Sequence, residues 1–580
     1  MAFQKYIILV LLATFVGVRG YAQCLSLPTA LETQLHEANG IFEGKVVAQA
    51  SFMGTDGNIY TSNHVEVCRV LKGSVGFEAD IVTEGGVYGD LMQLVTPGVS
   101  LAVGDYGLVV TNTDEHRSIA QLARSFYPID ERTGAVSRLK GVEHREQLYG
   151  LVAGITGSDV IELRRISLLE ENSGSRSTPE ISSVDPVQVT AGTQTVITIT
   201  GSNFGAEQGN GRVAFRNADD GGQSYVSIAP GPHYLSWSDT EVQLYVPSAT
   251  LYDQAVAGSG TIRVINDAGM VAQSSQQLAV NFAKSEVIYT EQLSSTLLIG
   301  DQTGGYIFTP NNNFVYATNG TGMASKVLQK WACNTGVNFS LSSDVVNSTA
   351  YANDDVNLLG FSASGQLPSY LLGRTVTTFS GCGGSNGLQW NLIEVDILLN
   401  SDLNWWTDEG QPMSGTFDLE TALLHELGHA MLLQHNNDPA SPMYFQLTEG
   451  SMRRNLYDPS LEGGNYVVTQ SVEATNTCGQ ELHQYFESSN CDLSVINGLD
   501  ESSESTISAF PNPFQDQVTI SGDWSPGTTF CLVDATGRRV LSGVLNADNQ
   551  TVGATALPRG MYLLEVRDDA GLHMQRLIKN

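Results

Sequence analysis

Three of the ten histidines in this chain of 580 residues fall within one short window, as His425, His429 and His435. Residues four apart in an α-helix lie on the same face, one turn from each other. His425 and His429 can therefore point at one site. A helix that continued to His435 would turn it by roughly 240° from His429, away from that site. For the three side chains to meet, the helix must end between His429 and His435.

The residues around this window match the needs of a metal-dependent hydrolase. Asp418 stands where a helix N-cap is expected, and an apolar helical segment follows it. Three neutral imidazoles leave a tetrahedral zinc ion one position for water, whose pKa falls toward ~7. Glu426 lies beside the first histidine and could take the proton of that water. One alternative is a buried helix whose histidines are only hydrogen-bonded. Another is a zinc site with Glu449 as third ligand.

The sequence Pro442-Met443-Tyr444 follows His435 closely. With the histidine window it makes residues 283–495 resemble the metzincin zinc peptidases, and among them the matrixin-like group. The resemblance implies an α+β catalytic domain with His425, His429 and His435 as zinc ligands. It implies Glu426 as general base and Met443 as the residue of a Met-turn beneath the metal.

Three departures from the matrixin pattern stand out. The family has Gly at the position of Leu432, where the helix must turn. Glycine takes a positive φ freely, whereas leucine there costs on the order of 1–2 kcal/mol. We predict that Leu432 has a positive φ and that Leu432→Gly keeps activity and stabilises the metal-free protein. No Pro-Arg-Cys-Gly segment supports a cysteine switch, and Tyr444 directly follows Met443, so a Met-x-Tyr ligand is absent.

Segments upstream of the histidines supply a sheet and a first core helix. Apolar residues recur at helical spacing at Ala324, Val327, Leu328 and Trp331. Residues 392–399 have the composition of a buried strand. Asp354 and Asp355 are adjacent and could hold structural calcium, with a solvated acidic loop as the alternative. Trp405 and Trp406 are expected to pack against the catalytic domain.

Two further regions carry recognisable β-domain patterns. The segment 178–282 has early prolines, an alternating strand at 196–200 and Gly-Ser-Asn-Phe-Gly at 201–205. It resembles an IPT/TIG domain, an immunoglobulin-like β-sandwich. The segment 505–580 has Phe-Pro-Asn-Pro-Phe near its start and Leu-Pro-Arg-Gly-Met-Tyr later. It resembles the C-terminal sorting domain of type IX secretion cargo, a small β-sandwich. That resemblance implies the type IX secretion machinery as a partner and export across a Gram-negative outer membrane.

The first 22 residues read as a secretory signal peptide. Lys5 precedes an apolar run, and small residues follow it, so we expect cleavage after Ala22. No later stretch is long and apolar enough to predict a membrane span in the mature chain. Residues 23–170 alternate short strand patterns with glycine-rich turns and predict a β-rich domain. A helical stretch before residue 40 gives this region a faint resemblance to netrin-like and OB-type domains.

Charge and cysteine usage fit an exported chain that does not bind nucleic acid. The formal net charge is −32, so nucleic acid and anionic lipid would be repelled. The seven cysteines are too scattered for a disulfide scaffold. We predict the pairs Cys24–Cys68, Cys333–Cys382 and Cys478–Cys491. Cys531 lies in an apolar strand pattern and is expected to be a buried thiol.

These features predict a multidomain secreted zinc endopeptidase that acts on protein or peptide substrates. The substrate would lie extended along a sheet edge beside the metal. One rival is a secreted adhesion protein with a degenerate peptidase domain, favoured by Leu432. Another is an enzyme that processes only its own chain.

Netrin-like folds include metalloprotease inhibitors that present an N-terminal Cys to zinc. Cys24 would be the second residue after cleavage, so this domain could restrain the peptidase in cis.

Overall fold

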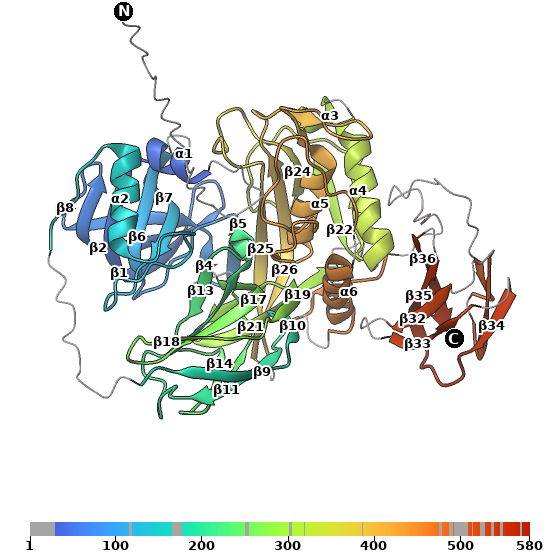
Figure 1. Cartoon of the computed structure of the whole chain (residues 1–580). Coiled ribbons are helices and arrows are strands. Elements are labelled where there is room, and N and C mark those ends of the chain that lie inside the picture. The colour runs from blue at the N-terminus through green and yellow to red at the C-terminus, as the bar shows by residue number, and fades with distance from the viewer. Residues whose placement is uncertain are drawn as a thin grey trace, which may run out of the picture.

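The computed structural model describes residues 30–579 except 115–118, 165–176, 250–254, 301–303, 318, 385–386, 457, 475–477, 487–490, 492–507, 513, 523–527, 535–538, 546–548 and 569–570. The described part is β-rich and divided into several packed bodies, as the sequence predicts (Figure 1). The signal peptide, Cys24 and the two polar linkers around 171–176 and 501–506 lie outside the described residues.

The N-terminal body is a closed sheet with two helices against it. Its strands run in the order β1-β6-β7-β3-β2-β8, and the sheet closes because β1 also pairs with β2. Helices α1 (Ala30–Glu37) and α2 (Arg145–Thr156) share its core. The strands are β1 (Gly40–Met53), β2 (Ile59–Lys72), β3 (Glu78–Glu84), β6 (Tyr106–Asp114), β7 (Ile119–Pro128) and β8 (Ile161–Glu162).

One hairpin leaves this closed sheet and joins another part of the chain. It consists of β4 (Gly86–Tyr88) and β5 (Leu91–Thr96). β5 pairs antiparallel with β25 (Gly373–Gly384), in the register Thr96↔Thr375 to Leu91↔Ser380. Figure 1 shows β5 between the blue N-terminal body and the yellow strand β25.

The second body is a β-sandwich, consistent with the immunoglobulin-like domain expected there. One sheet has the order β14-β15-β11-β9, and the facing sheet contains β13-β12-β17. The two sheets enclose one apolar core. The strands are β9 (Glu180–Asp185), β10 (Gln188–Ala191), β11 (Val196–Ser202), β12 (Arg212–Asn217), β13 (Tyr225–Ile228), β14 (Tyr234–Trp237), β15 (Glu241–Tyr245), β16 (Ser248–Ala249), β17 (Ala255–Ile265), β18 (Val271–Gln273) and β19 (Ala279–Ala283).

The third body carries the histidine window on a mixed sheet. Its central order is β21-β26-β24-β22-β23, and β25 pairs antiparallel with β26. Strand β26 contains the strand predicted at 392–399. The strands are β20 (Glu286–Tyr289), β21 (Gln292–Gly300), β22 (Tyr306–Pro310), β23 (Phe339–Leu341), β24 (Asn357–Phe361), β26 (Gly387–Leu399), β27 (Trp405–Trp406), β28 (Phe417–Asp418) and β29 (Glu481–Leu482).

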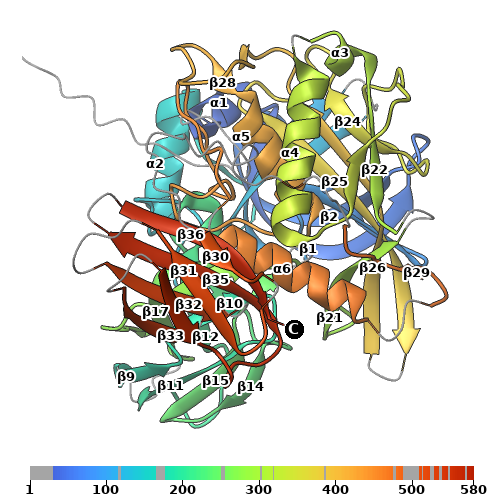
Figure 2. The same cartoon turned by 90° about the vertical axis from the view of Figure 1, so that its right-hand side faces the viewer.

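Helices α4 (Gly320–Thr335) and α5 (Leu419–Ala430) pack against this sheet and share its apolar core. The predicted helical positions Ala324, Val327, Leu328 and Trp331 are all buried on α4. Helices α3 (Asn312–Val315) and α6 (Asp458–Val472) complete the body. Figure 2 shows α4 and α6 on the side of this body nearest the C-terminal strands.

The C-terminal body is a small two-sheet unit around one core, drawn in red in Figure 2. Its sheets have the orders β30-β31-β34 and β33-β32-β35-β36. The strands are β30 (Ser508–Phe510), β31 (Gln517–Ser521), β32 (Thr529–Asp534), β33 (Arg539–Val544), β34 (Asn549–Gly553), β35 (Gly560–Asp568) and β36 (Gly571–Lys579). Cys531 is buried there, as predicted.

The predicted cysteine pairs are wrong where the structure describes both partners. The bonds are Cys333–Cys491 and Cys382–Cys478. The chain segment after α6 returns past the end of β25 and then past α4, so cysteines distant in sequence meet. Cys68 is a buried free thiol.

Two smaller predictions can be compared with the structure. Asp354 and Asp355 are exposed, and the metal-type cluster found among the described residues contains neither. Both aspartates thus lie in a solvent-exposed loop, and a calcium site there is not shown. Trp405 packs as predicted, with its ring 6.2 Å from that of Phe361.

Among the described residues, no helix combines the length and apolarity that a membrane crossing requires.

Candidate metal centre

Helix α5 begins and ends where the sequence predicts. Asp418 is its N-cap, and the Asp418 side chain accepts a hydrogen bond from the backbone N–H of Thr421 at 3.0 Å. The helix stops at Ala430, and Leu432 has φ +63°. The predicted positive φ at Leu432 is therefore confirmed. This left-handed residue reverses the chain and carries it back toward the helix face that holds His425 and His429.

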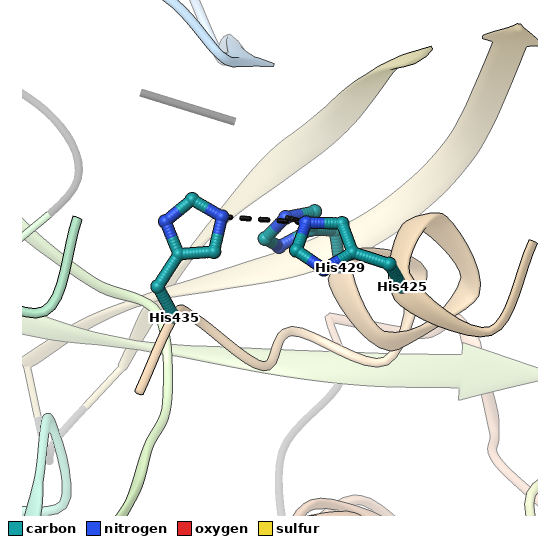
Figure 3. Close-up of side chains that lie close together, drawn as sticks. All are labelled: His425, His429 and His435. Atoms are coloured by element: carbon teal, nitrogen blue, oxygen red, sulfur yellow. Dashed lines mark hydrogen bonds between the residues drawn. The ribbon is translucent and has the colours of Figure 1, made fainter. Parts of the chain in front are cut away.

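The turn brings the three histidines together, as Figure 3 shows. His425 Nε2 lies 3.0 Å from His429 Nε2 and 3.3 Å from His435 Nε2. All three residues are buried, and their ligand atoms lie within 4.8 Å of one another. Burial lowers the pKa of His429 to about 3, and His435 nearby adds to this effect. The pKa of His425 is lowered well below its usual value, also by burial first. These two imidazoles are thus neutral at neutral pH.

The other ring nitrogens fix the tautomers. His425 Nδ1 donates to the carbonyl oxygen of Pro442 at 2.7 Å, and His429 Nδ1 donates to that of Leu433 at 2.9 Å. His435 Nδ1 lies 2.8 Å from Asp219 Oδ1. Carbonyl and carboxylate oxygens only accept, so the protons lie on Nδ1. Each Nε2 then presents a lone pair to the same point. Such convergence is repulsive without a cation, and a zinc ion fits this neutral nitrogen donor set.

Glu426 is fully buried beside this point and is held by β25. Its Oε2 accepts a hydrogen bond from Thr375 Oγ1 at 2.6 Å, whereas its Oε1 has no hydrogen-bond partner among the described residues. Gly373 lies against it, because a Cβ there would be only 2.7 Å from Oε1. Burial raises the pKa of Glu426 to about 8, while Thr375 and Arg374 act in the opposite direction. A cation at the histidines would favour the ionised carboxylate.

Met443 lies under the helix that carries the histidines. A Cβ on Gly428 would come within 2.2 Å of its Sδ atom, so glycine is required at that contact. The neighbouring Pro442 supplies the carbonyl that fixes His425. Glu449, the rival ligand, is exposed and does not belong to the cluster of three histidines.

Asp219 is a site residue that the sequence reasoning missed. It lies in the short helix η1 (Ala218–Asp220) of the sandwich, 216 positions before His435. Nothing local in the sequence marks it, because acidic residues such as Asp219 and Asp220 are common in the turn after a strand. Only the packing of the sandwich against the histidine turn brings the two together.

Parts of the chain that flank the site also cover it. Arg374, next to Thr375, makes a buried ion pair at 2.9 Å with Glu84 of the N-terminal body. A cavity beside the site is bordered by all three bodies, and its lining includes Pro97, Ser125, Asp219, Asp220, Tyr370 and Arg374. The centre thus lies at a junction of three bodies and is largely shielded from solvent.

Comparison with known families identifies three regions. Residues 306–458 match the Matrixin family, residues 179–282 the IPT/TIG domain and residues 508–580 the secretion system C-terminal sorting domain. The chain therefore carries a matrixin-type region and an IPT/TIG domain, and its sorting domain indicates export by type IX secretion. The matrixin match also implies zinc as the metal.

Comparison with individual proteins adds a distant relative. A 209-residue stretch is 24% identical to Metalloendoproteinase 2-MMP of Arabidopsis thaliana, covering 35% of this chain and half of that protein. This likeness supports a metallopeptidase. The extracellular region of plexin A4 aligns with 40% of this chain and 26% of its own at 13% identity, with a TM-score of 0.14. The four N-terminal immunoglobulin domains of Dscam1 (isoform 4.44) align with 93% of this chain and 99% of their own at 9% identity, with a TM-score of 0.11. Neither score is high enough to support an argument.

Proposed function

We propose that this exported metallopeptidase is a zinc endopeptidase in which Glu426 is the general base and His425, His429 and His435 hold the metal. The observation that carries the proposal is the convergence of three Nε2 lone pairs beside a buried carboxylate. Zinc bound there would lower the pKa of a water molecule and polarise a peptide carbonyl.

The chain's own groups have defined tasks in this scheme. Glu426 Oε1, which lacks a protein partner among the described residues, is the atom available to accept the proton of the attacking water. It would then return that proton to the leaving amine. Thr375 holds Oε2, so the carboxylate keeps one orientation during both transfers. Met443 packs against Gly428 and supports the helix turn between the first two histidines.

The substrate would be an extended peptide running along β25. This strand begins at Gly373, beside Glu426, and the edge that β5 occupies in this structure could align a peptide by main-chain hydrogen bonds once β5 has left it. Such alignment holds the scissile bond near the attacking water and lowers the entropic part of the barrier.

The test combines metal analysis with peptide cleavage on the same preparation. Wild type and Glu426→Gln should each hold one zinc per chain by native mass spectrometry. Cleavage of an unfolded protein such as reduced casein should fall by a factor of about 100 or more in Glu426→Gln. Glu449→Gln, which alters an exposed acid outside the cluster, should keep the wild-type rate.

Two outcomes would contradict the proposal. A purified chain that binds no zinc would remove the metal centre. A zinc-loaded chain that cleaves no unfolded substrate, even with the contacts between the N-terminal body and β25 weakened, would favour the adhesion protein. Cleavage of its own chain alone would point to self-processing.

A further inference from the structure

We propose, building on the zinc site of the proposed function, that Asp219 of the sandwich is a positioning residue for His435. Asp219 is buried and lies in η1, where its backbone N–H donates to the Asn217 side chain at 3.1 Å. This hydrogen bond holds the backbone of Asp219 in place and so limits the movement of its carboxylate. The 2.8 Å bond to His435 Nδ1 keeps the ring turned so that Nε2 faces the other two histidines.

The turn that carries His435 is attached to the sandwich on both sides. Before it, the backbone N–H of Gln434 donates to Ala283 at 2.8 Å. After it, the Asn437 side chain donates to the carbonyl of Ser259 at 2.6 Å and accepts from its N–H at 2.8 Å. The sandwich thus forms the support on which this turn lies.

His435 differs in this respect from the other two histidines. His425 and His429 are oriented by backbone carbonyls of the third body itself. His435 depends on a side chain from another body. Loss of such an outer partner weakens metal binding by about 10- to 100-fold, because the ring loses both its orientation and its basicity.

Zinc affinity tests this proposal without relying on activity. Asp219→Ala should raise the zinc dissociation constant, measured by chelator competition, by about 10- to 100-fold. Asp219→Asn keeps an acceptor oxygen and should recover part of that loss. The matched control is Asp220→Asn, whose buried carboxylate accepts from the N–H groups of Gln223 and Ser224 at 2.8 and 3.0 Å. Its affinity should stay close to wild type.

The cobalt-substituted protein provides a second readout. The visible absorption of Co²⁺ should change in Asp219→Ala and keep its wild-type form in Asp220→Asn. Unchanged affinity and spectrum in a folded Asp219→Ala would overturn the proposal, as would equal losses in both variants. A wild type without zinc would instead refute the proposed function.

A separate observation, the pairing of β5 with β25, carries a second inference about the same site. We infer that β5 occupies the position of the peptide substrate, so that the structure shows a latent form of the enzyme. β25 has β26 on one side and β5 on the other. The edge expected to receive a peptide is therefore already filled by Leu91–Thr96.

The pairing reaches the catalytic carboxylate. Thr96 is paired with Thr375, the residue that bonds to Glu426, and Pro97 follows in the lining of the cavity. A peptide in the same register would run toward the same carboxylate. The histidines and Glu426 are at most 3% exposed in this arrangement. No bulky substrate can reach them without movement.

Side chains of the hairpin, and of Asn58 and Glu84 in the adjoining N-terminal body, hold β5 in this place. Gln93 Nε2 donates to Thr378 Oγ1 at 3.3 Å, and Asn58 Nδ2 donates to the carbonyl of Tyr351 at 2.8 Å. Met92 and Leu94 are buried in the core of the third body. Glu84 pairs with Arg374 at 2.9 Å. Activation would require the N-terminal body to release these contacts. This device uses strand pairing and is independent of Cys24.

A reversible cross-link tests the inference. Gln93→Cys with Thr378→Cys joins two facing residues whose side chains already touch. If β5 must leave, the oxidised double variant should cleave reduced casein at least about tenfold more slowly than after mild reduction, since activity follows the open fraction. Each single cysteine variant should show no such change on reduction. The wild type should show none either, and it controls for the effect of the reductant on the native disulfides.

Weakening the contacts should have the opposite effect. Glu84→Gln removes the charge that pairs with Arg374 and should raise the casein cleavage rate above that of wild type, with zinc content unchanged. Equal rates in the oxidised and reduced cross-linked protein would overturn the inference while leaving the peptidase intact. Absence of cleavage in every form, with zinc bound, would instead refute the proposed function.

Discussion

Thr375 Oγ1 lies 2.6 Å from Glu426 Oε2, which joins β25 to the helix of the metal centre. Among the described residues, this hydroxyl donates the hydrogen bond that the Glu426 carboxylate accepts. It leaves Oε1 available for proton transfer. The strand proposed to align the substrate therefore also orients the carboxylate proposed as the general base.

Thr375→Val should lower kcat for peptide cleavage because Glu426 loses this donor and with it one fixed orientation. We expect a decrease of about tenfold, the size of a hydrogen bond to a charged group. Thr375→Ser keeps the hydroxyl and should stay near wild type. Steady-state kinetics with a fluorogenic peptide checks both, and a wild-type kcat in Thr375→Val would show that the bond has no catalytic role.

Gly373 gives a second test of the carboxylate's position. A methyl group there would lie 2.7 Å from Glu426 Oε1, so Gly373→Ala should displace the carboxyl group and strongly reduce cleavage. Gly383 lies on the same strand, and a Cβ there has no atom within 4 Å. Gly383→Ala should therefore keep full activity. Equal activity in the two variants, with zinc bound in both, would mean that Glu426 tolerates displacement.

The local parts of the site could be predicted from sequence, and the distant parts could not. Helix α5, its cap at Asp418 and the left-handed Leu432 follow from spacing within one segment. Asp219 and the strand β5 reach the site only through packing between bodies. The predicted pairs Cys333–Cys382 and Cys478–Cys491 failed for the same reason: they joined cysteines by their order in the sequence, whereas the fold crosses the two segments.

The buried carboxyl group of Glu394 should make the stability of the folded protein depend on pH. It is buried and accepts the N–H groups of Asp354, at 2.9 Å, and of Asp355. Burial raises its pKa from 4.5 to about 7, with the two aspartates adding to the shift and the hydrogen bonds opposing it. The folded state therefore holds more protons than the unfolded state between these values. Stability should fall by up to about 3 kcal/mol as pH rises from 4.5 to 7.

Glu394→Gln removes this titration and should melt at a higher temperature than wild type at pH 8, with a smaller difference at pH 4.5. Thermal unfolding at the two pH values measures this difference in melting temperature. Glu449→Gln, which changes an exposed carboxyl group, is the control. A calcium ion bound at this loop would give the opposite result. Added calcium would then raise the melting temperature of wild type, and Glu394→Gln would melt at a lower temperature than wild type in its presence.

Export should depend on the C-terminal body. A chain without residues 505–580 lacks the sorting domain matched at 508–580 and should remain in the periplasm of a host with type IX secretion. Immunoblots of the periplasm and the culture medium measure the distribution. Normal release of the truncated chain would show that the signal lies elsewhere.

Leu432 allows the strain of the turn to be measured. Its φ of +63° favours glycine, yet its side chain is 1% exposed and belongs to the core of the third body. Leu432→Gly therefore loses buried apolar contacts worth about 2–5 kcal/mol, more than the ~1–2 kcal/mol of strain that it relieves. Contrary to the expectation from sequence, the metal-free variant should be less stable than wild type.

Comparison with Leu432→Ala isolates the backbone contribution, because both variants lack the leucine side chain. At a helical φ glycine is the weaker residue by about 1 kcal/mol, whereas at a positive φ alanine carries the strain. We expect metal-free Leu432→Gly to be more stable than Leu432→Ala by about 1 kcal/mol in urea unfolding. The reverse order would mean that the helix continues through Leu432 in solution. His435 would then face away from the other two histidines, and zinc would lose its third ligand.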